Sequence, residues 1–382
     1  MKKTFWSFFL FSLCIQLHAQ AISSSIYNFS IEPPVEWEAS SDKSGKTFLF
    51  TSADKKFSLI LSVKDKGKTD NPQTAMSSLI KDLGPQISDV QQASFLYNNY
   101  PSALGSYIIK EEKESLFAFL LCIMAEKYEY WLHVSFQGNR LSNENLALLY
   151  SALDSFALGS LGRITPGPIT QFDAPMNTVK TPVKAKLSLG GQDLSLDMDK
   201  EQAEAAQRLV EREALIMSRY KERNTLAFLA WVRYYRFIYR DNYMRLQPLV
   251  KLLQAHMRSK DKDALAAELL RFCQNYSYER FTTPSDLIAP YASILSQKGD
   301  CDSSALTYLI LLNHMQITGA LLLSQTLGHA VVGVLSNTEG ASMQVMKERY
   351  VIAELTTKQP LGTVPTKVAN TKDWFPIIFT AR

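Results

Sequence analysis

Lys298-Gly299-Asp300-Cys301-Asp302-Ser303-Ser304 is followed directly by an apolar run that extends from Ala305 to Met315. The Gly-Asp pair is typical of a turn, and the apolar run predicts a buried helix that starts at the cysteine. Unpaired N–H groups and the positive end of the helix dipole would face the sulfur, and both favour the thiolate. The stretch therefore predicts a nucleophilic cysteine, on a helix that ends at Thr318–Gly319 with glycine in its usual C-terminal position.

A thiolate nucleophile needs a base, and the chain supplies a histidine at the start of the apolar run Gly328-His329-Ala330-Val331-Val332-Gly333-Val334. Apolar runs at 320–324 and 349–355 predict strands before and after it. With a period of two residues, Glu354 shares the apolar face of the second of these strands. Because a buried acid is costly without a partner, we expect Glu354 to hydrogen-bond His329, to fix its tautomer and to stabilise its imidazolium form.

Two further cysteines, Cys122 and Cys273, lie in apolar runs that are typical of core positions. A disulfide between them is an alternative, because an exported protein tolerates one. Cys301 alone has polar, turn-like neighbours. A thiol redox protein would need a C-x-x-C pair, which the sequence lacks.

The N-terminal 21 residues are typical of a secretory signal, with Lys2–Lys3 as the charged start, an apolar body from Phe5 to Leu17, and the cleavage site Ala19-Gln20-Ala21. The apolar body is shorter than the roughly 20 residues of a spanning helix. An uncleaved anchor and a lipoprotein modified at Cys14 are the alternatives. We expect an exported protein, in the periplasm, at the cell surface or outside the cell, with no membrane span after cleavage.

The chain of 382 residues has room for two or three domains, and its 46% hydrophobic content can fill proper cores. The formal charge of +4 is too weak to imply nucleic acid or an anionic membrane. A helix predicted over 226–244 interleaves aromatic residues with arginines, which can mark a nucleic-acid surface. We interpret it instead as an aromatic core stripe with arginines that reach to solvent, and expect no nucleic-acid partner.

The acidic residues of 193–199 follow the spacing Asp-x-Ser-x-Asp-x-Asp, which lacks the glycine and the distal glutamate of an EF-hand. We interpret Asp199 as the cap of a helix that begins at Lys200. His133 lies in an aromatic strand pattern and is interpreted as structural. We therefore expect no metal site and no cofactor.

The predicted elements indicate an α+β protein. Residues 1–21 are the signal peptide, and 22–158 form an α+β domain of short strands and one or two helices before a closing helix. Residues 159–182 are a Pro-rich extended linker, and 183–224 contain a hairpin around Gly190–Gly191 and a connecting helix. Residues 225–382 form the cysteine domain, in which helices pack on an antiparallel sheet.

The strand and helix order of 22–158 resembles the PsbP-like fold. The opening residues Pro33, Pro34 and Trp37 match that pattern, and so does a helix that ends near Ser155–Phe156. The resemblance covers about a third of the chain. It implies a docking or accessory role rather than a catalytic activity.

The order Cys, His, acid, with a helix followed by strands, resembles the transglutaminase-like cysteine superfamily, and most closely its papain-like bacterial and archaeal branch. The resemblance covers about 226–379. The segments that carry it are Pro290, Gly299–Asp302, Gly328–Val334, Tyr350 with Glu354–Thr356, the tail Leu361–Pro365, and the upstream Phe272–Tyr278. Many members have Asp where this chain has Glu354.

The resemblance implies Cys301 as nucleophile, His329 as general base and acid, and Glu354 as the orienting acid. The implied reaction is attack of the sulfur on an amide of a protein or peptide substrate, followed by hydrolysis or by acyl transfer to an amine. The export signal suggests that this substrate belongs to the cell envelope. The Cys301 N–H would hold the oxyanion, with Gln297 and Tyr291 as further candidates. The alternative is a non-catalytic exported adaptor in which Cys301 is vestigial.

Overall fold

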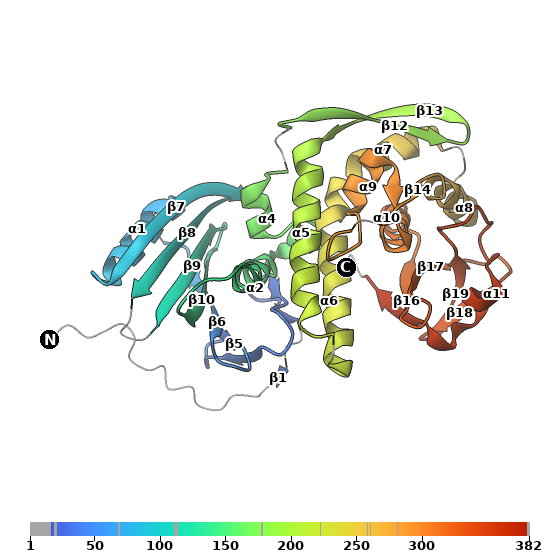
Figure 1. Cartoon of the computed structure of the whole chain (residues 1–382). Helices are drawn as coiled ribbons and strands as arrows, with labels where there is room; N and C mark the ends of the chain where they lie inside the picture. Colours follow the sequence, from blue (N-terminus) through green and yellow to red (C-terminus); the bar gives the residue numbers. More distant parts are fainter. Residues whose placement is uncertain are drawn as a thin grey trace. The chain divides into compact units, whose positions relative to one another are not determined.

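The computed structural model describes residues 17–18, 21–67, 69–110, 114–176, 179–221, 223–257, 259, 261–280 and 282–379. The predicted signal segment lies outside these residues, apart from Leu17–His18 and Ala21. The chain divides into two compact units, one of 1–175 with 215–230 and one of 176–214 with 231–382. Both contain helices and antiparallel sheets, so the protein is α+β as predicted (Figure 1).

The first unit is built on an eight-stranded sheet with the strand order β1-β4-β5-β6-β10-β9-β8-β7, drawn in blue to green in Figure 1. Its strands are β1 (Leu17–His18), β4 (Glu38–Ser41), β5 (Thr47–Thr51), β6 (Phe57–Asp65), β7 (Ile87–Tyr97), β8 (Tyr100–Lys110), β9 (Ser115–Met124) and β10 (Tyr128–Gly138). A smaller sheet pairs β2 (Ile22–Ser24), β3 (Phe29–Ile31) and β11 (Ala157–Leu158). All the pairings in both sheets are antiparallel.

Alternation along β9 sends successive side chains to opposite faces of the large sheet. Leu120 and Cys122 pack in the apolar cluster that holds Met76 of α1 (Pro72–Asp82). Leu121 and Ile123 pack in the larger cluster with α2 (Asn143–Asp154). The sheet therefore has an apolar core on each face.

The strand β7 was not predicted. Its central residues Gln91, Gln92 and Ser94 break the alternation of apolar and polar residues, and its pairing with β8 shifts register between Ser88 and Gln91. A bulge of this kind hides a strand from a period-two pattern.

The segment 159–182 is not the extended linker that its prolines predicted. It contains the short helices α3 (Gly159–Gly162) and α4 (Pro168–Asp173). The buried carboxylate of Asp154, at the end of α2, accepts the backbone N–H groups of Ile169 and Thr170 and the Thr170 hydroxyl at 2.7–3.1 Å. This acid caps α4 and holds the segment in a folded conformation.

The second unit begins with the predicted hairpin of β12 (Pro182–Leu189) and β13 (Gln192–Asp199), whose turn residues Gly190 and Gly191 both have positive φ. The helices α5 (Lys200–Ser218) and α6 (Asn224–Arg245) follow and contribute residues to both units. The Asp199 carboxylate accepts the Glu201 N–H at 3.0 Å, in agreement with its predicted capping role.

The remaining helices of this unit are α7 (Gln247–His256), α8 (Lys262–Cys273), α9 (Pro290–Ser296), α10 (Cys301–His314), α11 (Thr366–Ala369) and the 3-10 helix η1 (Thr371–Asp373). A five-stranded sheet has the order β18-β19-β17-β16-β20, with all pairings antiparallel. Its strands are β16 (Gly319–Ser324), β17 (His329–Leu335), β18 (Ser342–Val345), β19 (Glu348–Ala353) and β20 (Phe375–Ile378). The two-residue strands β14 (Ser277–Tyr278) and β15 (Lys298–Gly299) pair in parallel beside α9.

The helix α10 packs on β16 and β17. It starts at Cys301 as predicted, but it ends at His314 rather than at Gly319. Gln316 takes the left-handed conformation with φ of 58°, and the Ile317 N–H donates to the Leu312 carbonyl at 2.9 Å. A Schellman motif thus closes the helix at a glutamine, and Gly319 instead begins β16, where an added Cβ would come within 2.6 Å of Leu309.

Most aromatic residues of α6 are buried as predicted, although Phe228 is exposed and Trp231 is half-buried. Two arginines of the helix do not reach solvent. Arg233 donates to the Glu213 carboxylate at 2.7 Å, and Arg245 lies 3.1 Å from Asp241. All four of these side chains are buried. Each arginine therefore contributes a buried ion pair rather than a solvated charge.

Candidate active site

The structure brings His329 and Glu354 together. The Nε2 atom of His329 lies 2.9 Å from Oε2 of Glu354, which is 2% exposed. The second carboxylate oxygen, Oε1, accepts the backbone N–H of Thr356 at 2.9 Å and its hydroxyl at 2.7 Å. Burial alone would raise the pKa of Glu354, but the hydrogen bonds and charge of His329 and the hydrogen bonds of Thr356 together lower it. The carboxylate is therefore the stable form at neutral pH.

Local backbone geometry sets the position of the histidine. Ser324 pairs with His329 at the β16–β17 hairpin, and Gly328 enters the strand with a φ of +55°. Residues other than glycine adopt this backbone conformation only at a cost in free energy. The Gly-His pair thus follows from a turn that places His329 at the first residue of β17.

Glu354 lies directly after the C-terminal end of β19, the strand that pairs with β17. The register Val332–Ala353 places Glu354 one residue beyond the end of β19. The Gln274 side-chain amide donates to the backbone carbonyls of Glu354 and Gln359, both at 2.8 Å. Glu354 is therefore fixed through its main chain as well as through its carboxylate.

Cys301 occupies the first residue of α10 and is 1% exposed. Burial, with the nearby charges of Asp302 and Asp300, raises the pKa of its thiol to about 12, although a hydrogen bond from the Ala330 backbone and the charge of Arg280 act in the opposite direction. The prediction of a favoured thiolate is wrong for this structure, since removal of the sulfur from water outweighs the helix terminus. The Ala330 contact places the sulfur against the residue that follows His329 in β17.

The other two cysteines are free, buried thiols, so the alternative of a Cys122–Cys273 disulfide is wrong. Burial raises the pKa of both thiols. No pair of cysteines in the described residues forms a disulfide.

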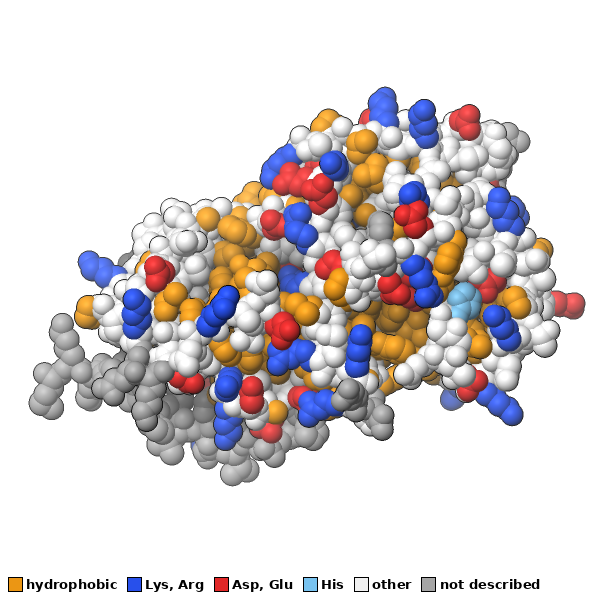
Figure 2. Space-filling model, in the orientation of Figure 1, with side chains coloured by type: hydrophobic (Ala, Val, Ile, Leu, Met, Phe, Trp, Pro, Cys, Tyr) orange, Lys and Arg blue, Asp and Glu red, His pale blue; other side chains and the backbone are white. Residues whose placement is uncertain are grey.

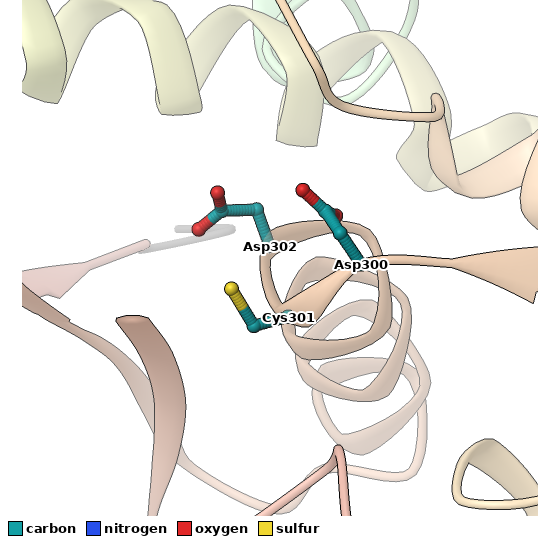
Figure 3. A group of neighbouring side chains, drawn as sticks. All are labelled: Asp300, Cys301 and Asp302. Atoms are coloured by element: carbon teal, nitrogen blue, oxygen red, sulfur yellow. The ribbon is translucent and has the colours of Figure 1, made fainter. Parts of the chain in front are cut away.

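Two acids flank Cys301 at the start of α10, and Figure 3 shows the three side chains leaving the same turn. Their potential ligand atoms lie within 4.8 Å of one another. Asp300 accepts the N–H and hydroxyl of Ser303 at 2.8 and 2.6 Å, as a helix cap does. Burial and the charge of Asp300 raise the pKa of Asp302, which also accepts a hydrogen bond from Tyr235. Capping and pairing account for both acids, and we assign no metal to them.

A cleft of about 390 Å³ opens over the histidine and its acid. The side chains that line it are Tyr278, Arg280, Leu327, Gly328, His329, Glu354, Thr356, Thr357, Pro365, Lys367 and Val368. Cys301 is not among them, because its sulfur lies buried beneath this surface.

Several contact residues gave no signal in the sequence. The Trp374 ring lies edge-on to the His329 ring, with centroids 6.1 Å apart, and its Nε1 donates to the Val368 carbonyl. Gln274 also went unnoticed as a contact of Glu354. Both lie far from the motif in sequence, and only the tertiary fold brings them to it. Thr356 was visible as the residue two places after the acid.

The two residues proposed for the oxyanion make other contacts, Tyr291 through its side chain and Gln297 through its main chain. The Tyr291 hydroxyl accepts the Asp199 backbone N–H at 3.0 Å, at the start of α5. Gln297 adopts the left-handed conformation after α9, and its carbonyl accepts the Ser277 N–H at 2.9 Å. Neither residue lines the cleft.

Charge on the visible surface is mixed. Figure 2 shows Lys and Arg side chains interspersed with Asp and Glu over the described part of this face. Among the described residues, no helix combines the length and the apolar character that crossing a bilayer requires.

Comparison with known proteins gives no family assignment. No family model matches the chain, and no curated protein does so either. The solution structure of cyanobacterial PsbP (CyanoP) from Synechocystis sp. PCC 6803 matches at 9% identity and a TM-score of 0.30, over 38% of this chain and 95% of that chain. A crystal structure from Bacteroides thetaiotaomicron VPI-5482 matches at 10% identity and a TM-score of 0.27, over 87% of this chain and 89% of that one.

TM-scores this low assign no fold to the chain. The first match bears the name of the family that residues 22–158 resemble, and the PsbP-like interpretation stays a prediction. Neither match is described as transglutaminase-like, so that resemblance is a prediction as well.

Proposed function

We propose that the protein is a transglutaminase-like cysteine enzyme that attacks amide bonds of a protein or peptide through Cys301, His329 and Glu354. The observation that carries the proposal is the 2.9 Å hydrogen bond between His329 Nε2 and Glu354 Oε2. The buried carboxylate also accepts two hydrogen bonds from Thr356, and the main-chain carbonyl of Glu354 accepts one from Gln274, so this acid is held firmly beside the histidine. It is what a histidine that exchanges protons needs beside it.

In the proposed reaction, His329 accepts the thiol proton of Cys301 through Nδ1, because Nε2 is engaged by Glu354. The sulfur attacks the amide carbonyl, and the backbone N–H of Cys301 stabilises the oxyanion. The imidazolium then protonates the leaving amine, and a thioester remains. Water releases the acid, or a second amine forms a new amide, and either step returns the proton to the sulfur.

The raised pKa of the Cys301 thiol decides the order of these events. A thiol with a pKa of about 12 is protonated at rest, so the proton moves to His329 as the sulfur attacks. A bound substrate must also reach a sulfur that is 1% exposed. We therefore propose that substrate binding opens the surface above Cys301.

The second candidate function is a non-catalytic adaptor, and the buried, protonated state of Cys301 favours it. In that case the hydrogen bond between His329 and Glu354 is structural, and the first unit serves to dock a partner. The two functions differ in whether an electrophile held in the cleft is captured by the sulfur.

The test uses the full chain and a peptidyl vinyl sulfone, which forms a stable thioether with an active cysteine. We expect intact-mass analysis to show one adduct in the wild type, none in Cys301→Ser, and a rate lower by about 10²–10⁴-fold in His329→Ala. Cys122 and Cys273 serve as internal controls, because both are buried thiols outside the cleft. An adduct rate that is the same in His329→Ala would decide for the adaptor.

The reaction type is tested with casein as the acyl donor and monodansylcadaverine as the amine. Fluorescent casein would assign amine transfer, and new casein fragments would assign hydrolysis. Wild type and Cys301→Ser are compared, and product formed by the serine variant would contradict the proposal.

We further propose that the protein is exported and that residues 22–158 are a PsbP-like docking domain. Export rests on the charged, apolar and A-x-A segments at 2–21, and the docking domain rests on its strand order. A fusion of residues 1–25 to alkaline phosphatase tests export, since that enzyme needs an oxidising compartment for activity.

A further inference from the structure

The charged side chains that face the cleft beside His329 are mainly basic. Those that line it are Arg280, Lys367 and Glu354. The carboxylate of Glu354 is already engaged within the protein, since one oxygen contacts His329 and the other accepts two hydrogen bonds from Thr356. The charge that the cleft offers to a ligand is therefore that of the arginine and the lysine.

Arg280 is held in place on one wall. Its Nε donates to the Tyr278 hydroxyl at 3.0 Å, and this contact is the main reason that the pKa of the guanidinium is raised. Among the described residues, the only carboxylate within 4.0 Å of its guanidinium is that of Asp286, at 4.0 Å, and both side chains of that pair are about half exposed. Arg280 also interacts electrostatically with the buried Asp300, which its Ser303 contacts already engage. The exposed pair with Asp286 is weak in water, so the Nη atoms remain available to a bound carboxylate.

Lys367, in the short helix α11, also lines the cleft, and its side chain is exposed. Within the described residues no carboxylate lies within 4.0 Å of its Nζ. The acid that follows Tyr278, Glu279, is already paired with Lys298 at 2.7 Å. The basic character of the cleft is thus not cancelled at its rim.

Arg280 and His329 line the same cleft. A ligand group held by Arg280 is therefore bound in the cleft that presents the proposed base to the substrate. Asp300 and Asp302 are engaged by Ser303 and Tyr235, and neither lines the cleft.

We propose that the cleft selects peptides that carry a carboxylate next to the attacked amide, with Arg280 as the main contact and Lys367 as the second. This inference rests on the proposed function only where it places the carboxylate next to the amide that Cys301 attacks. The binding of an acidic peptide is a property of the cleft, whether or not the sulfur reacts.

The test measures binding to the full-length Cys301→Ser variant, which cannot form a thioester, by isothermal titration calorimetry. The probes are the blocked tripeptides acetyl-Ala-Glu-Ala-amide and acetyl-Ala-Gln-Ala-amide, which differ in charge and hardly in shape. We expect the acidic peptide to bind about tenfold tighter, as one charged hydrogen bond provides. The added changes Arg280→Gln and Lys367→Gln should together abolish that preference.

Matched controls come from the same unit. Arg271→Gln and Lys358→Gln remove the same charges from a different cavity, of about 370 Å³, and should leave the preference intact. Equal affinities for the two peptides, or no saturable binding of the acidic peptide at millimolar concentration, would overturn the inference. So would a preference that survives in the Arg280→Gln/Lys367→Gln variant.

The two proposals fail in different ways. If the vinyl sulfone labels Cys301 but the two tripeptides bind alike, the enzyme stands and the substrate class is wrong. If the acidic peptide is preferred through Arg280 but no adduct forms, the cleft is a carboxylate-binding site of an adaptor.

Discussion

His329 Nε2 lies 2.9 Å from Glu354 Oε2, although the two residues are 25 positions apart, one at the start of β17 and the other directly after β19. The pairing leaves only Nδ1 of the imidazole for proton exchange with another group. The strands β17 and β19 hold the two side chains in this relation through their ladder.

Thr356→Val removes the hydroxyl that donates to Glu354 Oε1 at 2.7 Å and keeps the backbone N–H. We expect the rate of vinyl sulfone addition at Cys301 to fall about tenfold, since a hydrogen bond to a charged group is worth about 1.5–3 kcal/mol. Thr356→Ser, which retains the hydroxyl, should restore the rate. A valine variant as fast as the wild type would show that this oxygen does not orient Glu354.

Glu354→Gln tests the lowered pKa of the carboxyl. A group whose pKa is lower in the folded protein stabilises it above the unfolded value, near 4.5, and that stability is lost as the pH falls through the folded pKa. We expect urea unfolding to show the wild type as more stable than the variant at neutral pH. The difference should shrink below about pH 4.5, and a difference that grows as the pH falls would contradict the assigned cause.

Gly328→Ala tests the turn that delivers His329. The added Cβ meets no atom within 4 Å, so its cost is purely conformational at a φ of +55°. We expect a loss of about 1–2 kcal/mol in the free energy of unfolding, measured by urea titration. Gly45→Ala, at a φ of +66° and with equally open space, is the matched control for stability, and only the Gly328 variant should also slow adduct formation.

Cys301 alkylation by iodoacetamide tests the raised pKa of the thiol in the free protein. With a pKa of about 12, the thiolate fraction is small at neutral pH and grows about tenfold for each pH unit. We expect the rate at Cys301, followed by peptide mass mapping, to rise steadily from about pH 7 to about pH 9. A rate that levels off within that range would show a pKa below the ordinary value of 9.0 and would contradict the raised pKa.

The helix that begins at Cys301 and the strand that begins at His329 could be predicted from local patterns. The first needs a turn followed by apolar residues, and the second needs an apolar run after Gly328. The relation of Glu354 to His329 followed from period-two geometry and the cost of a buried acid. These predictions depend on neighbours within a few residues.

Properties that depend on packing could not be predicted in this way. The protonated state of Cys301 follows from its burial against β17, which outweighs the helix terminus. The strand β18 is joined to β19 by a turn with Met346 at φ of 56°, and no glycine or asparagine marks it. The helix α4 depends on Asp154, which lies fourteen residues before it in sequence.

The burial of Cys301 also bears on its redox chemistry. Oxidation by peroxide and exchange with disulfides both begin at a thiolate that reagents can reach. A sulfur that is 1% exposed and protonated offers neither, so it resists conversion to sulfenic acid or a mixed disulfide. The packing that buries the Cys301 thiol thereby keeps it reduced, without a second cysteine in the described residues forming a disulfide with it.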